Sequence, residues 1–234
     1  WHIDGNGGTI PDSNFIGTTD AKALEFKVNN LRSGLIDFTY ANASFGYQAM
    51  YNNTPAGNGT SAFGYKALFS NTSGYRNTAV GSSALQSNTT GHLNTGLGMY
   101  AAYHITTGNF NTSVGAQNMF YNKTGTSNTS TGVNSMFNDT SGSWNSATGV
   151  NSLYNNKSGN NNSAFGANSM LYSVSGNNNT ATGWYALTKN TTGSYNTAVG
   201  DSALYANTTG NYNTAVGKEA GPTSATLRNT AALG

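Results

Sequence analysis

The sequence contains no cysteine and few charged residues, and both shortages exclude classes of protein. Without cysteine, neither disulfide bonds nor thiolate metal sites can hold the fold together. Asp, Glu, Lys and Arg make up 8% of the 234 residues, against about 25% in ordinary globular domains. The net charge of +2 is too small and too scattered for a nucleic-acid groove. No apolar run of about 20 residues exists, so we expect no membrane insertion in this segment.

Motifs of catalysis are also missing. The sequence has no HExxH, GxxxxGK[ST] or GxSxG motif, and His2, His92 and His104 do not recur. The repeats described below hold few acids, among them Asp139 and Asp201, which excludes a calcium roll and leaves no carboxylate pair for glycoside hydrolysis. We therefore expect no enzymatic activity, no cofactor and no bound metal.

Glycine is abundant, with 30 residues, and its spacing is regular. We call the first series the closing glycines: Gly46, Gly64, Gly81, Gly98, Gly115, Gly132, Gly149, Gly166, Gly183, Gly200 and Gly217. Their separation is 18 residues once and 17 residues otherwise. The second glycines run seven residues ahead: Gly57, Gly74, Gly91, Gly108, Gly125, Gly142, Gly159, Gly176, Gly193 and Gly210. Such a period predicts an all-β fold, a parallel β-solenoid (β-roll) of about eleven 17-residue coils, where a coil is one turn of the solenoid.

The motif NTAVG, at 77–81, 196–200 and 213–217, closes a coil. Seventeen residues suit two short strands and two turns, and we expect Thr and Val to lie on the two faces of a strand. Each glycine corner is expected to need a positive φ or to leave no room for a Cβ atom. Small and then large apolar residues follow, as in Ala84-Leu85, and should fill a thin core that stacking completes.

An asparagine recurs four residues before the closing glycine, and we call this set the strand asparagines: Asn77, Asn94, Asn111, Asn128, Asn145, Asn162, Asn179, Asn196 and Asn213. Stacked coil on coil, they are predicted to form an amide ladder. Many asparagines of the repeats also read as N-x-[ST] glycosylation acceptors, but repetition alone produces that triplet.

Aromatic residues recur five residues after the closing glycine, and the sequence predicts that they pack between coils or chains rather than bind sugars: Tyr51, Phe69, Tyr103, Phe120, Phe137, Tyr154 and Tyr205. If surface contacts exist, we expect them where the columns break, at Trp144, Trp184, Tyr185, Tyr100 and Tyr103.

The ends of the chain depart from the period. Residues 1–39 begin with a turn-rich stretch, and the alternation in 23–28 predicts a strand, a turn and a second strand, which would form a β-rich cap or connector. The repeat solenoid should occupy 40–221. The closing motif NTAALG at 229–234 predicts that 222–234 start a further repeat or a connector, after a longer spacer. With Trp1 in place of an initial Met, we expect a piece of a longer protein.

The pattern N-T-x-[VF]-G-x-x-A-L, with NTTG between copies, resembles the head repeats of trimeric autotransporter adhesins. It is more similar to the repeats of phage-type tail fibres and surface proteins that end in an endosialidase-type intramolecular chaperone. The stretch NFIGTTDAKALEFKVNN at 14–30 resembles the segment that often precedes such arrays. The resemblance implies a homotrimer of β-rolls, intertwined or side by side, that forms a rigid stalk or head.

Two functions remain open at this point. The first is a structural fibre or adhesin module, extracellular on a virion, an injection particle or a bacterial surface, that contributes to attachment to a glycan or protein receptor. The second is an ice-binding or carbohydrate-binding solenoid with a repeated threonine or aromatic face. Its threonine rank, interrupted by Ser146 and Ser163, stands three residues before the closing glycine: Thr78, Thr95, Thr112, Thr129, Thr180, Thr197 and Thr214.

Overall fold

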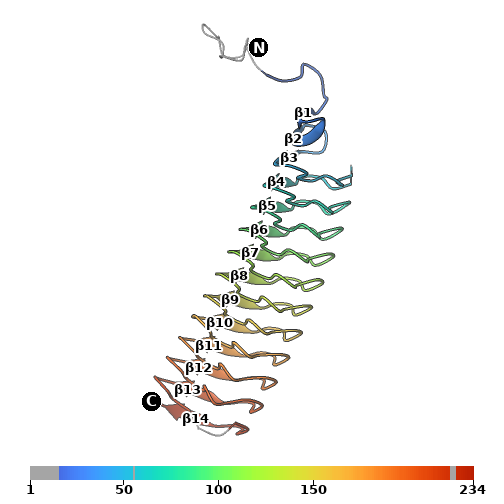
Figure 1. Ribbon diagram of the computed structural model, residues 1–234. Helices are drawn as coiled ribbons and strands as arrows, with labels where there is room; N and C mark the ends of the chain where they lie inside the picture. The colour runs from blue at the N-terminus through green and yellow to red at the C-terminus, as the bar shows by residue number, and fades with distance from the viewer. Residues whose placement is uncertain (1–15, 55, 222–224) are drawn as a thin grey trace, which may run out of the picture.

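The protein is a rod of stacked strands (Figure 1). The computed structural model describes residues 16–54, 56–221 and 225–234, and these contain strands and turns but no helix. The strands are β1 (Leu24–Val28), β2 (Leu31–Asp37), β3 (Asn42–Phe45), β4 (Ser61–Phe63), β5 (Thr78–Val80), β6 (Thr95–Leu97), β7 (Thr112–Val114), β8 (Thr129–Thr131), β9 (Ser146–Thr148), β10 (Ser163–Phe165), β11 (Thr180–Thr182), β12 (Thr197–Val199), β13 (Thr214–Val216) and β14 (Ala231–Leu233).

One sheet joins the fourteen strands in the order of the sequence. From β3 to β14 every pairing is parallel, and Ala79 of β5 lies beside Gly96 of β6, its counterpart one coil later. The pairing of Ala43 with Ser61 contains the single 18-residue coil. These registers confirm the predicted parallel β-solenoid of about eleven coils.

Each coil contains one strand, and the prediction of two strands was wrong. After β5 the chain runs through turns until β6 begins at Thr95. Within that stretch φ is 57° at Ser83, 50° at Leu85 and 56° at Leu93, and the same positions are left-handed in the other coils. Left-handed residues bend the chain instead of extending it, so no second strand forms.

The core is a single column of large side chains inside the stack. It consists of the residues four places after the closing glycine, which are at most 1% exposed: Met50, Leu68, Leu85, Ala102, Met119, Met136, Leu153, Met170, Leu187 and Leu204. In the coil of the small Ala102, the fully buried Ile105 supplies the large side chain instead. Small buried residues such as Ala79 and Ala84 surround the column. A coil therefore has about one large apolar side chain of its own and depends on its neighbours for stability.

The two faces of the strands also differ from the prediction. Thr78 and Val80 lie on the same outward face of β5, while Ala79 between them is buried. Side chains alternate along a strand, so the first and third residues of a three-residue strand must share a face. The apolar residue before the closing glycine is therefore on the surface and not in the core.

Both glycine columns leave no room for a side chain. A Cβ atom on Gly132 would lie 2.6 Å from the carbonyl oxygen of Gly149 in the next coil, and φ at Gly132 is 128°. A Cβ atom on Gly142, one of the second glycines, would meet the carbonyl oxygen of Gly159 at 2.6 Å. Close approach of backbones thus requires glycine in both columns, and the closing column needs positive φ as well.

At the N-terminal end, β1 and β2 form the antiparallel hairpin that the alternation in 23–28 predicts. Asn29 and Asn30 turn the chain with φ of 49° and 59°, a conformation that asparagine tolerates. β2 then pairs with β3, and Arg32 donates hydrogen bonds to the carbonyls of Met50 and Tyr51 in the first coil. The turn-rich stretch expected before the hairpin lies mostly outside the described residues.

At the C-terminal end the period continues without a longer spacer. Ala231 of β14 pairs with Thr214 of β13, and Leu233 pairs with Val216, in the register of the other coils. Gly234 donates its N–H to the carbonyl of Val216, as the closing glycines do elsewhere. The motif at 229–234 therefore forms a further rung of the same sheet, although residues 222–224 lie outside the described part.

Candidate functional site

The strand asparagines join each coil to the next with their side chains. Asn128 donates from Nδ2 to the carbonyl of Gly142 in its own coil, 2.8 Å away. Its Oδ1 accepts the backbone N–H of Asn145 in the next coil, at 2.9 Å. Direct amide-to-amide bonds are fewer, for example Asn179 to Asn162 at 3.1 Å. The structure therefore places these residues in a buried column whose bonds run chiefly to the backbone.

A second asparagine column, which the sequence analysis missed, lies seven residues after the closing glycine. We call its members the turn asparagines: Asn53, Asn71, Asn88, Asn122, Asn156, Asn190 and Asn207. Asn88 donates from Nδ2 to Oδ1 of Asn71, 2.7 Å away, and to the carbonyl of Gly91 at 2.9 Å. The signal was available in the sequence, because the residue recurs at the same spacing as the strand asparagines.

The turn asparagine column is interrupted at Ile105, Asp139 and Ser173. Asn88 Oδ1, which faces the coil of Ile105, is buried without a hydrogen-bond partner among the described residues. Asp139 accepts from Gly142 N–H at 2.8 Å and from Asn122 Nδ2 at 3.1 Å. Burial raises the pKa of the Asp139 carboxyl to about 7, although these hydrogen bonds act in the opposite direction.

Most of the N-x-[ST] triplets start at asparagines of these two columns. The asparagines of nine such triplets are buried: Asn42, Asn71, Asn88, Asn111, Asn122, Asn128, Asn156, Asn190 and Asn207. Because the amide nitrogen of a buried ladder residue is not accessible, these positions cannot accept a glycan in the folded chain.

The predicted aromatic column forms stacks of parallel rings along the rod. Tyr103, Phe120, Phe137 and Tyr154 follow one another with centroid separations of 5.2, 5.3 and 5.2 Å and interplanar angles of 3° to 10°. Tyr51 stacks on Phe69 at 5.6 Å in the same way. These rings pack coil on coil within one chain, and Phe69, Tyr103, Phe120, Phe137 and Tyr154 are half-buried.

The five candidate contact residues fall into three places. Trp184 and Tyr185 lie against each other, with ring centroids 4.4 Å apart. Tyr100 contacts Tyr103 edge to face at 5.5 Å, at the end of the aromatic stack. Trp144 belongs to neither pair, stands one residue before a strand asparagine and is 67% exposed.

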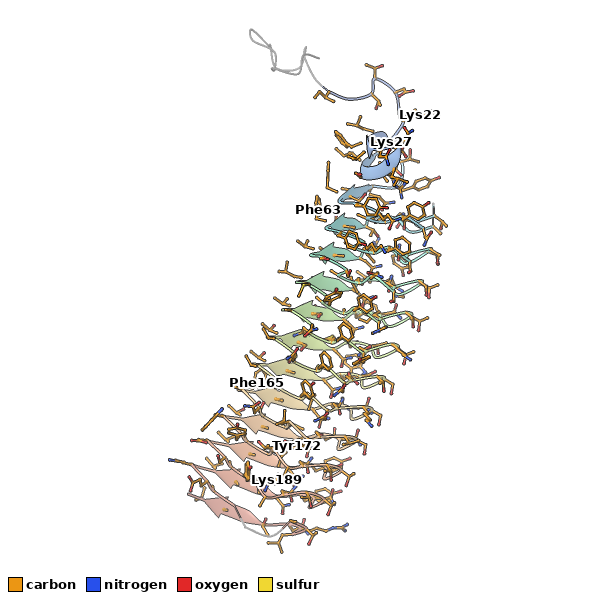
Figure 2. The ribbon with its side chains drawn as sticks, viewed as in Figure 1. Lys22, Lys27, Phe63, Phe165, Tyr172 and Lys189 are labelled. Carbon is orange, nitrogen blue, oxygen red and sulfur yellow. The ribbon has the colours of Figure 1, made fainter. Side chains whose placement is uncertain are left out.

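An exposed apolar stripe lies beside the strands, where the sequence predicted Thr and Val on opposite faces. We define the outer stripe as the exposed apolar residues directly before and after the closing glycines and Gly234: Phe45, Tyr47, Phe63, Tyr65, Val80, Leu97, Met99, Val133, Val150, Phe165, Trp184, Val199, Val216 and Leu233. Figure 2 shows Phe63 and Phe165 on the same side of the stack, beside the strands and away from the turns. The stripe runs the length of the rod.

Reactive groups do not converge on this surface. Among the described residues, no group of three or more His, Cys, Asp or Glu side chains could hold a metal ion. Burial lowers the pKa of His104, with a further contribution from the charge of Lys123, and its ring stacks on Tyr121 at 5.3 Å. His104 therefore belongs to the aromatic packing. No helix long and apolar enough to cross a membrane occurs in the described ranges.

Comparison with known proteins gives no relative for this chain: no protein-family model, no curated protein and no solved structure matches it.

Proposed function

We propose that this chain is a structural and adhesive fibre module that assembles with two further copies of itself. The outer stripe carries this proposal. Its members are mostly 36% to 55% exposed in the single chain, and large apolar patches on a soluble surface mark interaction sites. Because the stripe repeats with the period of the coils, a second copy in parallel offers a matching stripe at every level. Three-fold symmetry comes from the resemblance to fibre and adhesin repeats.

The hydrogen bonds between coils supply the stiffness that a fibre needs. Backbone pairing, the two asparagine columns and the aromatic stacks all connect one coil to the next, so the rod cannot bend without breaking several contacts together. At about 4.8 Å for each coil, eleven coils extend about 50 Å. We place the assembled rod outside the cell, on a virion, an injection particle or a bacterial surface, where it contributes to attachment.

Light scattering of the purified chain tests the assembly. We expect a particle of three times 24.3 kDa, and a compact monomer would overturn the proposal. The double variant Val133→Lys, Val150→Lys introduces charge into the outer stripe and should give monomers that retain the circular dichroism of the wild type. The matched control is Thr90→Lys, Thr107→Lys, at exposed turn positions outside the stripe, which should remain trimeric. Binding of the wild type to bacterial or host cells tests attachment separately.

The alternative function, an ice-binding or carbohydrate-binding face, is favoured by the outward threonine rank. Thr78 pairs in register with Thr95, and Thr180 with Thr197, so hydroxyls repeat along the outer face of the sheet. A flat, regular array of hydroxyls of this kind can bind ordered water. The neighbouring rank mixes Val, Leu, Phe and Thr, which makes the lattice irregular. Thermal hysteresis decides the ice-binding version: freezing-point depression without a change in melting point would support it, and its absence would remove it.

A further inference from the structure

One outward column directly precedes the strand asparagines or their counterparts, and we call it the pre-strand column. Its members are Gly59, Arg76, Leu93, Phe110, Ser127, Trp144, Asn161, Asn178, Tyr195, Tyr212 and Asn229. All have left-handed backbones, with φ between 53° and 63°. Glycine and asparagine adopt this conformation readily, whereas bulky residues rarely do.

Phe110 and Trp144 occupy this column at a conformational cost that burial does not offset. Their side chains are 55% and 67% exposed. Asn161 and Asn178, farther along the column, show that the coil can place a better-suited residue at the same site. Because stacking imposes the same conformation in every coil, it is the exposure of two large rings where asparagine also fits that calls for a functional explanation.

Phe110 and Trp144 border a gap at the level of the coil between them. Tyr195 and Tyr212, on consecutive coils of the same column, stack with centroids 4.9 Å apart and planes 5° from parallel, so one coil accommodates one ring. Phe110 and Trp144 are two coils apart, a spacing of about 10 Å. Ser127 stands between them and supplies no ring. The result is an open hollow of about 400 Å³ lined by Asn109, Phe110, Thr126, Ser127 and Trp144.

Polar groups without partners lie beside the gap. Asn109 accepts the N–H of His92 with Oδ1, at 2.9 Å, but its Nδ2 donates to no group in the described part of the chain. The equivalent amides of three other coils do donate to the carbonyl two residues earlier, at 2.9, 3.1 and 3.2 Å: Asn160, Asn177 and Asn211. The Ser127 hydroxyl also has no hydrogen-bond partner among the described residues. Two polar groups are thus free to bind a ligand.

We propose that the slot between Phe110 and Trp144 binds one pyranose ring of a cell-surface glycan. The C–H groups of a sugar ring can contact Phe110, which packs edge to face on His92, and Trp144, while its hydroxyls can reach Asn109 Nδ2 and the Ser127 hydroxyl. A purely apolar ring would leave both polar groups unused. The proposal deepens the attachment function and rests on it for the source of the glycan, whereas the slot itself rests on the geometry of the pre-strand column.

The test is an array of glucose, galactose, mannose and N-acetylhexosamine oligosaccharides, followed by titration of the bound ones with isothermal titration calorimetry as readout. Trp144→Asn and Phe110→Asn should each weaken binding about tenfold, because each removes one stacking ring and installs a residue suited to the backbone. Ser127→Tyr should fill the gap with the protein's own ring and abolish binding. Tyr212→Asn is the matched control: it removes an exposed ring of the same column where no gap exists, and it should bind as the wild type does.

Two results would overturn the slot: no oligosaccharide class binds the wild type, or Ser127→Tyr binds as tightly as the wild type. Binding of indole or p-cresol without binding of any sugar would also overturn it, since the slot would then select an apolar ring. Thermal melts of all four variants show whether the fold is retained. Failure of the attachment function is distinguishable, because it appears as a monomeric rod that does not bind cells while sugar binding and its loss in Ser127→Tyr persist.

Discussion

In their coil, Ala102 is small where the other coils have Leu or Met, and Ile105 is large and apolar where most of them have an asparagine. Ile105, which donates its N–H to the carbonyl of Ala102 at 3.3 Å, is fully buried where other coils place a turn asparagine. Ala102 stands in the column of buried Leu and Met residues. One coil thus keeps its core volume with the large side chain at another position, and Asn88 Oδ1 is left without a partner.

Restoring the common pattern in this coil should stabilise the rod. The double variant Ala102→Leu, Ile105→Asn gives Asn88 Oδ1 a donor and keeps the apolar volume, so we expect a gain of about 1 kcal/mol in the free energy of unfolding. Ile105→Asn alone should be destabilising by about 2 kcal/mol, because it leaves a cavity beside Ala102. Chemical denaturation measures both. A double variant no more stable than the single one would show that the two columns are not coupled.

Asp139 should make the stability of the rod depend on pH. Its pKa is raised from 3.8 to about 7 in the folded chain, chiefly by burial, so the folded state retains the proton over a range in which the unfolded state has lost it. The free energy of unfolding is therefore highest below pH 4, falls as the pH rises toward 7 and stays low above it.

Asp139→Asn restores a turn asparagine and should remove most of this pH dependence. We expect a stabilisation on the order of a few kcal/mol at pH 8 and little change at pH 4. Thermal melts across pH 4 to 8 are the measurement, and Asp201→Asn, at a half-buried acid outside the column, is the control. An unchanged slope in Asp139→Asn would contradict the assignment.

Substitution in the closing glycine column should be far more damaging than substitution at an open glycine. Gly132→Ala places a Cβ atom 2.6 Å from the Gly149 carbonyl oxygen at a φ of 128°, and we expect a loss of about 3 kcal/mol or more. Gly59, with φ of 63°, would bring its Cβ no closer than 3.4 Å to Arg76. Gly59→Asn should therefore melt like the wild type. Equal melting temperatures for the two variants would be inconsistent with this packing.

Removing one strand asparagine should cost as much as a core truncation. Asn128→Ala leaves the Gly142 carbonyl and the Asn145 N–H without their side-chain partners, and two such buried groups cost about 2–6 kcal/mol. The adjacent Thr129→Ala is the control, because Thr129 is exposed and its side chain makes no hydrogen bond within the described residues. Hydrogen exchange should show faster opening of the neighbouring coils in Asn128→Ala and no change in Thr129→Ala.

The sequence predicts the stacking because the glycines are constrained by the backbone of the adjacent coil, which is the same in every repeat. It does not predict the path between strands. Leucine and methionine have no preference for left-handed backbones, so the residue types do not predict the φ values of 50° at Leu85 and 52° at Met136. The stacking of identical coils imposes that conformation on whichever residue is present.

The outward face of the strands could have been derived from alternation alone, since Thr78 and Val80 are separated by one residue. Whether that face points toward the core or toward solvent could not be derived from alternation. It depends on the buried turn residues opposite Ala79, which only the closed coil brings into view. Finding the slot beside Ser127 requires both the sequence and the structure. The missing ring is recognised only once the pre-strand column and the spacing of its coils are known.

The arrangement of the hydrogen bonds also has a mechanical consequence. Because they run from coil to coil, a pull along the rod loads the interfaces in series, and each interface carries the whole force. The force at which the rod ruptures is then set by its weakest interface and not by the average. The steps on either side of Ile105 and of Ser173 lack the side-chain bond that the turn asparagine column makes at the other steps, so extension under load should begin at one of these places and release the chain on either side as separate blocks.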